Sequence, residues 1–328
     1  LFVFGVTKKG QTNWYQFGGF GFQPSEFVKT GTALLLAKYL SFSQINLKNF
    51  QHQLIAFAIM GLPILLILMQ PDAGSAMIFI SLVFVLYREG LPGWYLIAGV
   101  SAIILFFLAL LFNPLYILIG VFVVMAVHYF NNRKITRNIF VYLLLFLVTA
   151  GFTYSVNHVY NNVLEPHQKD RIDVLIGEDV DMKNEGYNLN QSMIAIGSGG
   201  LTGKGYLEGT QTKGGFVPEQ HTDYIFTTVG EEWGFLGSLI VLGAFAGLII
   251  RITLLAQRQK HAFGMYYGLA VASILFVHFT VNIGMTLGMM PVIGIPLPFF
   301  SYGGSSLWAF SLMVFVFLRW DAYRWESL

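Results

Sequence analysis

The chain has 328 residues, of which 55% are hydrophobic and only 11% carry a charge, and its mean hydropathy is +0.63. Soluble domains carry roughly 25% charged residues, so this composition excludes an ordinary water-soluble fold. The formal net charge of +2 gives no argument for nucleic acid as a partner. The sequence contains no cysteine, which excludes disulfides and thiolate metal sites.

Apolar stretches long enough to cross a bilayer follow one another along the chain. A membrane-spanning helix needs about 20 mostly apolar residues. The predicted spans cover residues 26–42, 52–69, 73–88, 92–112, 114–130, 138–156, 224–250, 264–287 and 304–320. The chain opens on an apolar stub without Met, and we expect earlier spans to be missing. The predicted fold is an all-α, polytopic membrane helix bundle of nine spans plus this stub, in a single membrane domain over 1–328.

Lys and Arg residues divide unevenly between the two faces that alternating spans define. Eleven of the 19 basic residues fall on one face. They are Lys38, Lys48, Arg88, Arg133, Lys134, Arg137, Arg251, Arg258, Lys260, Arg319 and Arg324. Outside the long loop at 157–223, the other face holds only Lys8 and Lys9. Because short loops rich in Lys and Arg stay in the cytoplasm, we expect the 157–223 loop on the extracytoplasmic side and the C-terminus in the cytoplasm.

The 157–223 loop is far longer than a usual connection between helices, which favours a functional element over a linker. In its second half, residues 191–197 predict a short amphipathic helix that ends at Ser198 and the two glycines after it. We expect function to concentrate in this half, with Gln191 and Ser192 as candidate supporting residues.

Glu26 and Lys29 lie three residues apart at the outer start of the first predicted span, so they share one helix face and can pair. Charges at membrane depth are costly, which favours a paired arrangement that faces inward. The spacing alone allows two interpretations: a structural ion pair that fixes helix packing, or a direct role in a site.

Two aspartates stand directly before predicted spans. Asp72 and Asp223 can each cap the helix that follows and complement the positive end of its dipole. Asp223 differs from Asp72 because it closes a polar run with acid, amide, imidazole and hydroxyl groups. The other members of this run are Glu219, Gln220, His221 and Thr222. This run is the best candidate for general acid or base chemistry.

Glu231 and Glu232 lie about two turns into the span that follows Asp223. Neighbouring residues on a helix point in different directions, so at most one of them faces the same cavity as Asp223. For the other we predict polar packing between helices.

Two irregular segments flank these spans. Residues 197–205 are rich in glycine and include Lys204, so their amides can face a phosphate, or the segment can be a simple flexible turn. Residues 291–304 are rich in Pro and Gly and include Ser301, and such backbone is tolerated at membrane depth only where it is wet or packed in protein. We interpret His278 as a packed, hydrogen-bonded residue, and a zinc site has little support.

Six ordered motifs resemble the SEDS family of bacterial cell-wall proteins. They are Gln23-Pro24-Ser25-Glu26, Gln70-Pro71-Asp72-Ala73-Gly74, Ala195-Ile196-Gly197-Ser198-Gly199-Gly200, Pro218-Glu219-Gln220-His221-Thr222-Asp223, Glu231-Glu232-Trp233-Gly234 and Pro296-Leu297-Pro298-Phe299-Phe300-Ser301-Tyr302-Gly303-Gly304-Ser305. Residues 209–212, 282–285 and 292–296 resemble the elongation branch of the family more than its division branch. Compared with the family, N-terminal spans are absent or reduced to the stub, and the pair of spans at 114–130 and 138–156 is additional.

The resemblance implies a polymerase that joins lipid II units into glycan strands on the outer face of the bacterial cytoplasmic membrane during cell-wall elongation and cell-shape maintenance. It implies a class B penicillin-binding transpeptidase and the elongation machinery as partners, and undecaprenyl-diphosphate-linked glycan as the donor. The family's loop aspartate corresponds to Asp223, and its membrane Glu and Lys correspond to Glu26 and Lys29. Lys204, Lys29 or a divalent cation (Mg²⁺ or Mn²⁺) are alternative sources of charge for the departing diphosphate.

Two other functions compete with this one. A bundle with charged residues inside the membrane and broken outer segments can also form a translocation path, which makes a flippase or transporter for the same lipid the main rival. The third hypothesis is a non-catalytic scaffold that recruits the transpeptidase, in which Asp223 is dispensable.

Overall fold

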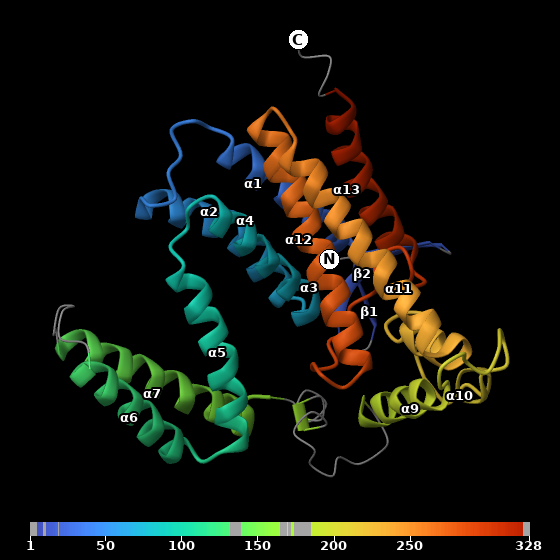
Figure 1. The fold of residues 1–328 in the computed structure, drawn as a ribbon, viewed down its shortest axis with the longest axis horizontal. Helices are drawn as coiled ribbons and strands as arrows, with labels where there is room; N and C mark the ends of the chain where they lie inside the picture. The colour runs from blue at the N-terminus through green and yellow to red at the C-terminus, as the bar shows by residue number, and fades with distance from the viewer. Residues whose placement is uncertain are drawn as a thin grey trace. The chain divides into compact units, whose positions relative to one another are not determined.

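The computed structural model describes residues 5–8, 11–18, 20–131, 139–164, 169, 172–173 and 185–323. Its contacts divide the chain into two compact units, one of Leu1–Pro92 with Asp181–Leu328 and the other of Gly93–Val180. Most of the described residues are helical (Figure 1), so the all-α prediction is confirmed. The single domain over 1–328 stays a prediction.

The first unit is a helix bundle organised around α12 (Ala262–Thr286). This helix packs against α1 (Pro24–Leu40), α11 (Ile225–Gln257) and α13 (Gly304–Tyr323), and Figure 1 shows α11, α12 and α13 side by side. In the most apolar stretch of α12, 67% of the residues are buried, compared with 22% in α11, so α12 is the more central helix of this unit. The other helices of this unit are α2 (Phe50–Leu68), α3 (Ala73–Ile78), the 3₁₀ helix η1 (Phe79–Leu82), α4 (Val83–Arg88), α9 (Glu185–Ser198) and α10 (Thr210–Lys213).

A small antiparallel sheet precedes α1. Its strands are β1 (Val6–Lys8), β2 (Gln11–Phe17) and β3 (Phe20–Phe22), in the order β1-β2-β3. Tyr15 pairs with Phe22 and Phe17 with Phe20, so the turn between β2 and β3 is tight. Gly18 in this turn has φ of +60°, a value that glycine adopts at little cost. The hairpin brings β2 close to the start of α1.

The second unit consists of α5 (Trp94–Leu111), α6 (Pro114–Asn131) and α7 (Ile139–Asn162). α7 contacts both α5 and α6. Only 6% to 11% of the residues in the most apolar stretch of each helix are buried. An apolar helix with so little packing inside the protein is stable only in an apolar solvent such as a bilayer.

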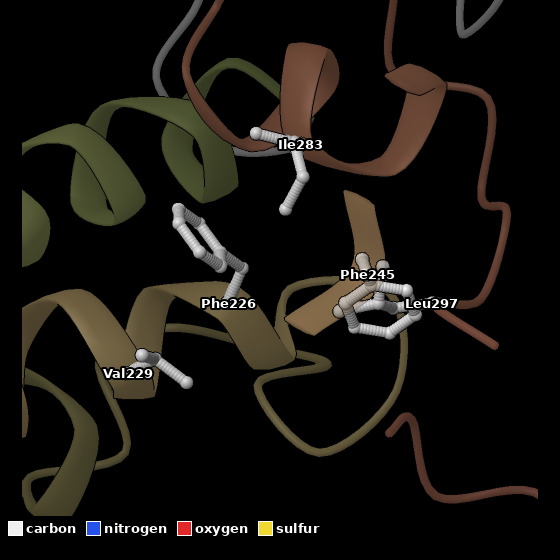
Figure 2. Packing of buried hydrophobic residues seen from close by; sticks show 5 residues of the cluster. All are labelled: Phe226, Val229, Phe245, Ile283 and Leu297. Carbon is white, nitrogen blue, oxygen red and sulfur yellow. The ribbon is translucent and has the colours of Figure 1, made fainter. Parts of the chain in front are cut away.

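A buried apolar cluster connects α11 with its neighbours. Phe226 and Val229 come from the first part of α11 and Phe245 from its later part, while Ile283 lies on α12 and Leu297 precedes α13. Figure 2 shows Phe226 pointing from α11 toward Ile283, and Phe245 beside Leu297. Burial of such side chains stabilises the fold by about 1.5–3 kcal/mol each, so this cluster holds α11 to α12 and to the irregular segment before α13.

The helix α11 is interrupted at Gly234, where φ is +63°. Backbone groups freed by this break bond to the glycine-rich segment. The amides of Phe235 and Leu236 donate to the carbonyls of Gly200 and Leu201, and the amides of Lys204 and Gly205 donate to those of Glu231 and Glu232. A Cβ atom at Gly203 would lie 2.0 Å from the Glu232 carbonyl oxygen, so the contact requires glycine. Residues 199–205 therefore act as a splint across the break.

Seven of the nine predicted spans agree with helices of the structure to within three residues, although the one at 73–88 is divided among α3, η1 and α4. α7 and α11 extend six and seven residues further than the spans predicted at 138–156 and 224–250. Within the described part of the chain, six helices are long and apolar enough to cross a membrane: α2, α5, α6, α7, α11 and α12. The count of nine crossings and the orientation stay predictions. The helix predicted at 191–197 is confirmed as α9, which ends at Ser198 as expected but begins earlier.

Several residues of these predictions lie outside the described residues. They are residues 1–4 of the apolar stub, Lys9, and four of the basic residues assigned to the cytoplasmic face, Arg133, Lys134, Arg137 and Arg324.

Candidate active site

A cavity of about 390 Å³ opens in the first unit where several helices begin. Glu26 lies in the first turn of α1, Asp72 caps α3, and Asp223 comes just before α11. The other lining residues are Asn13, Trp14, Gln23, Ser75, Ile78, Glu219, Thr222, His278, Gly294, Ile295, Pro296, Tyr302, Gly303 and Ser306. The starts of α1, α3, α11 and α13 thus meet around one polar space. The positive ends of their dipoles favour carboxylates there.

Asp223 is half-buried at this cavity, on a segment that the rest of the site holds in place. The Ser301 hydroxyl donates to the Thr222 carbonyl at 2.6 Å and accepts from the Leu297 amide at 2.8 Å. The Tyr302 amide donates to the His221 carbonyl at 2.8 Å. The segment before α13 therefore braces the backbone next to Asp223, which gives Ser301 a supporting position.

The rest of the polar run is arranged around Glu219. This residue has φ of +58°, which is uncommon outside glycine, and its carboxylate accepts a hydrogen bond of 2.8 Å from the Thr222 hydroxyl. Glu219 and Thr222 line the cavity together with Asp223. His221 is exposed and is not one of the cavity-lining residues within the described part of the chain.

Glu26 and Lys29 form the ion pair that their spacing predicts, at 2.8 Å, with 3% and 2% of their side chains exposed. The Lys29 ammonium also lies 3.0 Å from Nε2 of His278 and over the ring of Phe310. Glu26 and His278 line the cavity. The prediction that His278 is packed and hydrogen-bonded is confirmed, and the structure adds its position at the cavity.

Asp72 caps α3, as its position before a predicted span indicated, because its carboxylate accepts from the amide and the hydroxyl of Ser75 at 3.0 and 2.8 Å. The same carboxylate accepts from Asn13 of β2 at 2.9 Å. Asp72 therefore serves a structural role, and it also fastens the hairpin to the cavity wall.

Glu231 and Lys204 form a second ion pair, at 2.7 Å, away from the residues that line the cavity in the described structure. The Glu231 carboxylate is fully buried and accepts from the amides of Gln211 and Thr212, both at 2.8 Å. The Lys204 ammonium thus already faces an anion. Glu232, on the next position of α11, is also buried but is not among the described cavity residues.

The candidate residues on α9 lie beside α11 and α12. Ser192 is fully buried, and its hydroxyl lies 2.5 Å from the Thr227 hydroxyl and 3.1 Å from the Thr286 carbonyl. Gln191 is half-buried on the same helix. Neither is among the described residues that line the cavity, so the structure places them at the packing of α9 against the bundle.

The cavity carries the charge of four carboxylates and, among the described lining residues, no Lys or Arg side chain. Glu26 is neutralised by Lys29, and the Glu219 carboxylate accepts from the Thr222 hydroxyl. In the described part of the chain there is no group of three or more His, Asp or Glu side chains that could hold a metal ion. The carboxylate, amide and hydroxyl groups that line the cavity can form hydrogen bonds to the hydroxyl groups of a sugar.

The sequence reasoning did not identify Asn13, Trp14 and Gly294 as lining residues. The aromatic residues Trp14, Tyr15 and Phe17, followed by a pair of glycines, are a hairpin signal that could have revealed the first two. Gly294 has φ of +67°, and a Cβ atom there would lie 3.2 Å from Oδ2 of Asp223. Nothing in the local sequence could show that approach, because the two residues lie far apart along the chain.

The fold and the cavity define a multi-pass membrane protein with a carboxylate-lined site where its helices begin. The family model described as "Cell cycle protein", named for FtsW, RodA and SpoVE, matches residues 1–137 and 115–325. The chain belongs to this family, and the resemblance seen in its motifs is confirmed.

The chain is similar to relatives whose names belong to the elongation branch of the family. The chain is 34% identical over 331 residues to the peptidoglycan glycosyltransferase RodA of Treponema pallidum, covering 93% of this chain and 76% of the relative. It is 35% identical over 306 residues to the peptidoglycan glycosyltransferase MrdB of Escherichia coli K12, covering 93% and 69%. A solved structure of a peptidoglycan synthase complex that coordinates polymerisation and crosslinking contains a similar chain, with 27% identity, a TM-score of 0.68, and coverage of 99% of this chain and 77% of that one.

Proposed function

We propose that this protein is a peptidoglycan glycosyltransferase that polymerises lipid II into glycan strands, with Asp223 as the general base. The relatives that carry this activity in their names match nearly the whole chain. The observation that carries the proposal for the site is the position of Asp223, which lies half-buried at a polar cavity without a Lys or Arg among its described lining residues. A carboxylate in such a place can accept a proton from a bound hydroxyl group.

In the proposed reaction, the 4-hydroxyl oxygen of the acceptor sugar attacks the anomeric carbon of the lipid-linked donor chain, with inversion. The new glycosidic bond forms as the bond from that carbon to undecaprenyl diphosphate breaks. The hydroxyl proton passes to Asp223, and the diphosphate leaves with the bonding electrons. Thr222 and Glu219, joined by a hydrogen bond of 2.8 Å at the same wall, are placed to orient the acceptor.

The departing diphosphate needs compensation of its negative charge. Lys29 and Lys204 are both within 2.8 Å of a carboxylate, so neither presents an uncompensated ammonium group to the cavity. We therefore assign the diphosphate to neither lysine. Helix starts around the cavity contribute the positive ends of their dipoles, which favour an anion nearby.

Partner and location follow from the same proposal. We propose a class B penicillin-binding transpeptidase as the partner, which the matched synthase complex, with its joint polymerisation and crosslinking, supports. We propose the bacterial cytoplasmic membrane as its location, with the cavity on the extracytoplasmic side, and the distribution of Lys and Arg supports this. Elongation of the cell wall is the corresponding cellular process.

The flippase hypothesis predicts polar groups along a path through the bilayer. The cavity-lining residues instead gather at helix starts, with Glu26 in the first turn of α1 and Asp72 at the cap of α3. This arrangement supports chemistry at one face of the membrane.

The test measures glycan-strand formation from purified lipid II by the full-length protein with its transpeptidase. Wild type is compared with Asp223→Asn at equal amounts of folded protein. A matched control is Asp321→Asn, the same change at an aspartate that pairs with Arg258 at 2.5 Å, outside the cavity. We expect strands from wild type and control and none from Asp223→Asn. Equal polymer from Asp223→Asn would remove this residue as the base, and no polymer from wild type would favour lipid transport.

A further inference from the structure

Asn282 is a fully buried polar residue on α12, one helical turn beyond His278. Its side-chain amide donates two hydrogen bonds, one to the Asp223 carbonyl at 2.8 Å and one to the Ile295 carbonyl at 2.7 Å. Asn282 is not among the described residues that line the cavity, whereas Asp223 and Ile295 both are. It can therefore affect the cavity only through its neighbours.

The two carbonyls belong to two separate segments of the chain, and each segment lines the cavity. One segment ends at Asp223 and the other passes from Gly294 to Pro296 before α13. They approach closely, since a Cβ atom at Gly294 would lie 3.2 Å from Oδ2 of Asp223. Because neither segment is helical, hydrogen bonds to a rigid neighbour must fix their separation. Asn282 provides one such link to both.

The neighbouring His278 fixes the second segment one turn away. The Lys29 ammonium can only donate, so Nε2 of His278 accepts at 3.0 Å, and Nδ1 then carries the proton that is donated to the Pro296 carbonyl at 3.2 Å. α12 thus anchors the cavity wall at two successive turns, and only the Asn282 anchor also reaches Asp223.

The Asn282 amide is not arranged for greatest stability. Its Oδ1 atom is buried and makes no hydrogen bond to any described residue. An unsatisfied buried acceptor costs about 1–3 kcal/mol, which an apolar residue would avoid, but an apolar residue would leave the Asp223 and Ile295 carbonyls without these donors. The two donated bonds supply a reason for an amide at this position.

We propose that Asn282 is a positioning residue for the glycosyl transfer, which sets the direction of the Asp223 carboxylate by holding residues 223 and 295 at a fixed separation. The inference rests on the proposed function, and it adds a residue that touches no substrate. Misplacement of a reacting group by about 1 Å can reduce a rate about 100-fold. The effect should therefore appear in kcat and much less in KM, because substrate contacts are unchanged.

The variant Asn282→Asp keeps the shape of the side chain but loses at least one of the two donors, since a neutral carboxyl donates once and a carboxylate not at all. The matched control is Thr286→Val, at a fully buried residue one turn further along α12 whose hydroxyl, among the described residues, donates to the Ile283 carbonyl of the same helix. Both variants of the full-length protein, with its transpeptidase, are assayed with purified lipid II at equal folded amounts. Their melting temperatures are measured alongside.

We expect Asn282→Asp to lower kcat about 10- to 100-fold with KM changed less than about threefold, while Thr286→Val keeps kcat within about twofold of wild type. Asn282→Gln, which retains both donors, should recover part of the loss. If Asn282→Asp yields no folded protein, Asn282→Ser, with a single donor, replaces it under the same criterion.

An unchanged kcat in a folded Asn282→Asp protein would overturn the inference while leaving the glycosyltransferase intact. A loss of kcat would overturn it too if Asp223→Asn proves fully active, because Asn282 would then act through another group. A wild type that forms no strands would instead refute the proposed function itself.

Discussion

Replacing Lys29 with methionine would leave the Glu26 carboxylate buried beside an apolar side chain. The two charges lie 2.8 Å apart with 2% and 3% of their side chains exposed. At an effective dielectric constant near 20, their attraction is about 6 kcal/mol, which the cost of removing both from water largely offsets. Removing one partner does not return that cost, so the net loss of stability is about 3–5 kcal/mol.

The assay is thermal unfolding of purified protein in one detergent. With roughly 2–4 °C per kcal/mol, we expect Lys29→Met to lower the melting temperature by about 6–20 °C. The double variant Glu26→Gln with Lys29→Met should recover most of this loss, because no uncompensated charge remains. Lys38→Met is the matched control, since it makes the same change at an exposed lysine of α1 and should shift the midpoint little.

Two results would refute this reasoning. One is a Lys29→Met midpoint no lower than that of the Lys38→Met control. The other is a double variant whose loss equals the sum of the single losses, because the carboxylate and the ammonium would then not be coupled.

Three further changes test other parts of the first unit. Gly203→Ala would place a Cβ atom 2.0 Å from a carbonyl oxygen of α11, so thermal unfolding should show a loss of stability of more than about 2 kcal/mol. The control Gly197→Ala, whose Cβ atom would have nothing within 4 Å, should change stability by less than about 0.5 kcal/mol. Gly294→Ala should reduce strand formation from lipid II at least tenfold, because its Cβ atom would lie 3.2 Å from Oδ2 of Asp223, its φ is +67°, and a small misplacement of the Asp223 carboxylate has about this effect on the rate. Activity equal to wild type would contradict the cavity geometry. Glu231→Gln should lower stability by about 2–4 kcal/mol, since the buried carboxylate accepts hydrogen bonds from two backbone amides and pairs with the Lys204 ammonium at 2.7 Å. An unchanged unfolding midpoint would show that this ion pair does not stabilise the fold.

Much of the fold was predictable because a bilayer imposes a simple rule on sequence. Helices must be long and apolar to cross it, and most predicted stretches coincide with observed helices to within three residues, apart from the ends of α7 and α11. The i to i+3 spacing also predicted the Glu26–Lys29 pair, which lies within one helix. Local geometry determines both features, so the local sequence contains them.

The parts that could not be predicted depend on contacts between distant residues. No spacing rule connects Lys204 with Glu231, or Asn282 with Asp223, and the sequence left open whether residues 197–205 face a phosphate or form a turn. The structure shows a splint on α11, which neither alternative included. The hairpin at residues 11–22 was not predicted because its strands are short and aromatic-rich and contain no long apolar run.

The order in which the chain is synthesised favours formation of the splint. Its contacts join residues only 27 to 35 positions apart, from Lys204 with Glu231 to Gly200 with Phe235. Closing so short a loop costs little entropy compared with the contacts between distant helices. Residues 199–205 leave the ribosome before Gly234 does. The backbone groups that the break in α11 exposes can therefore form their hydrogen bonds as soon as they emerge, without a later part of the chain.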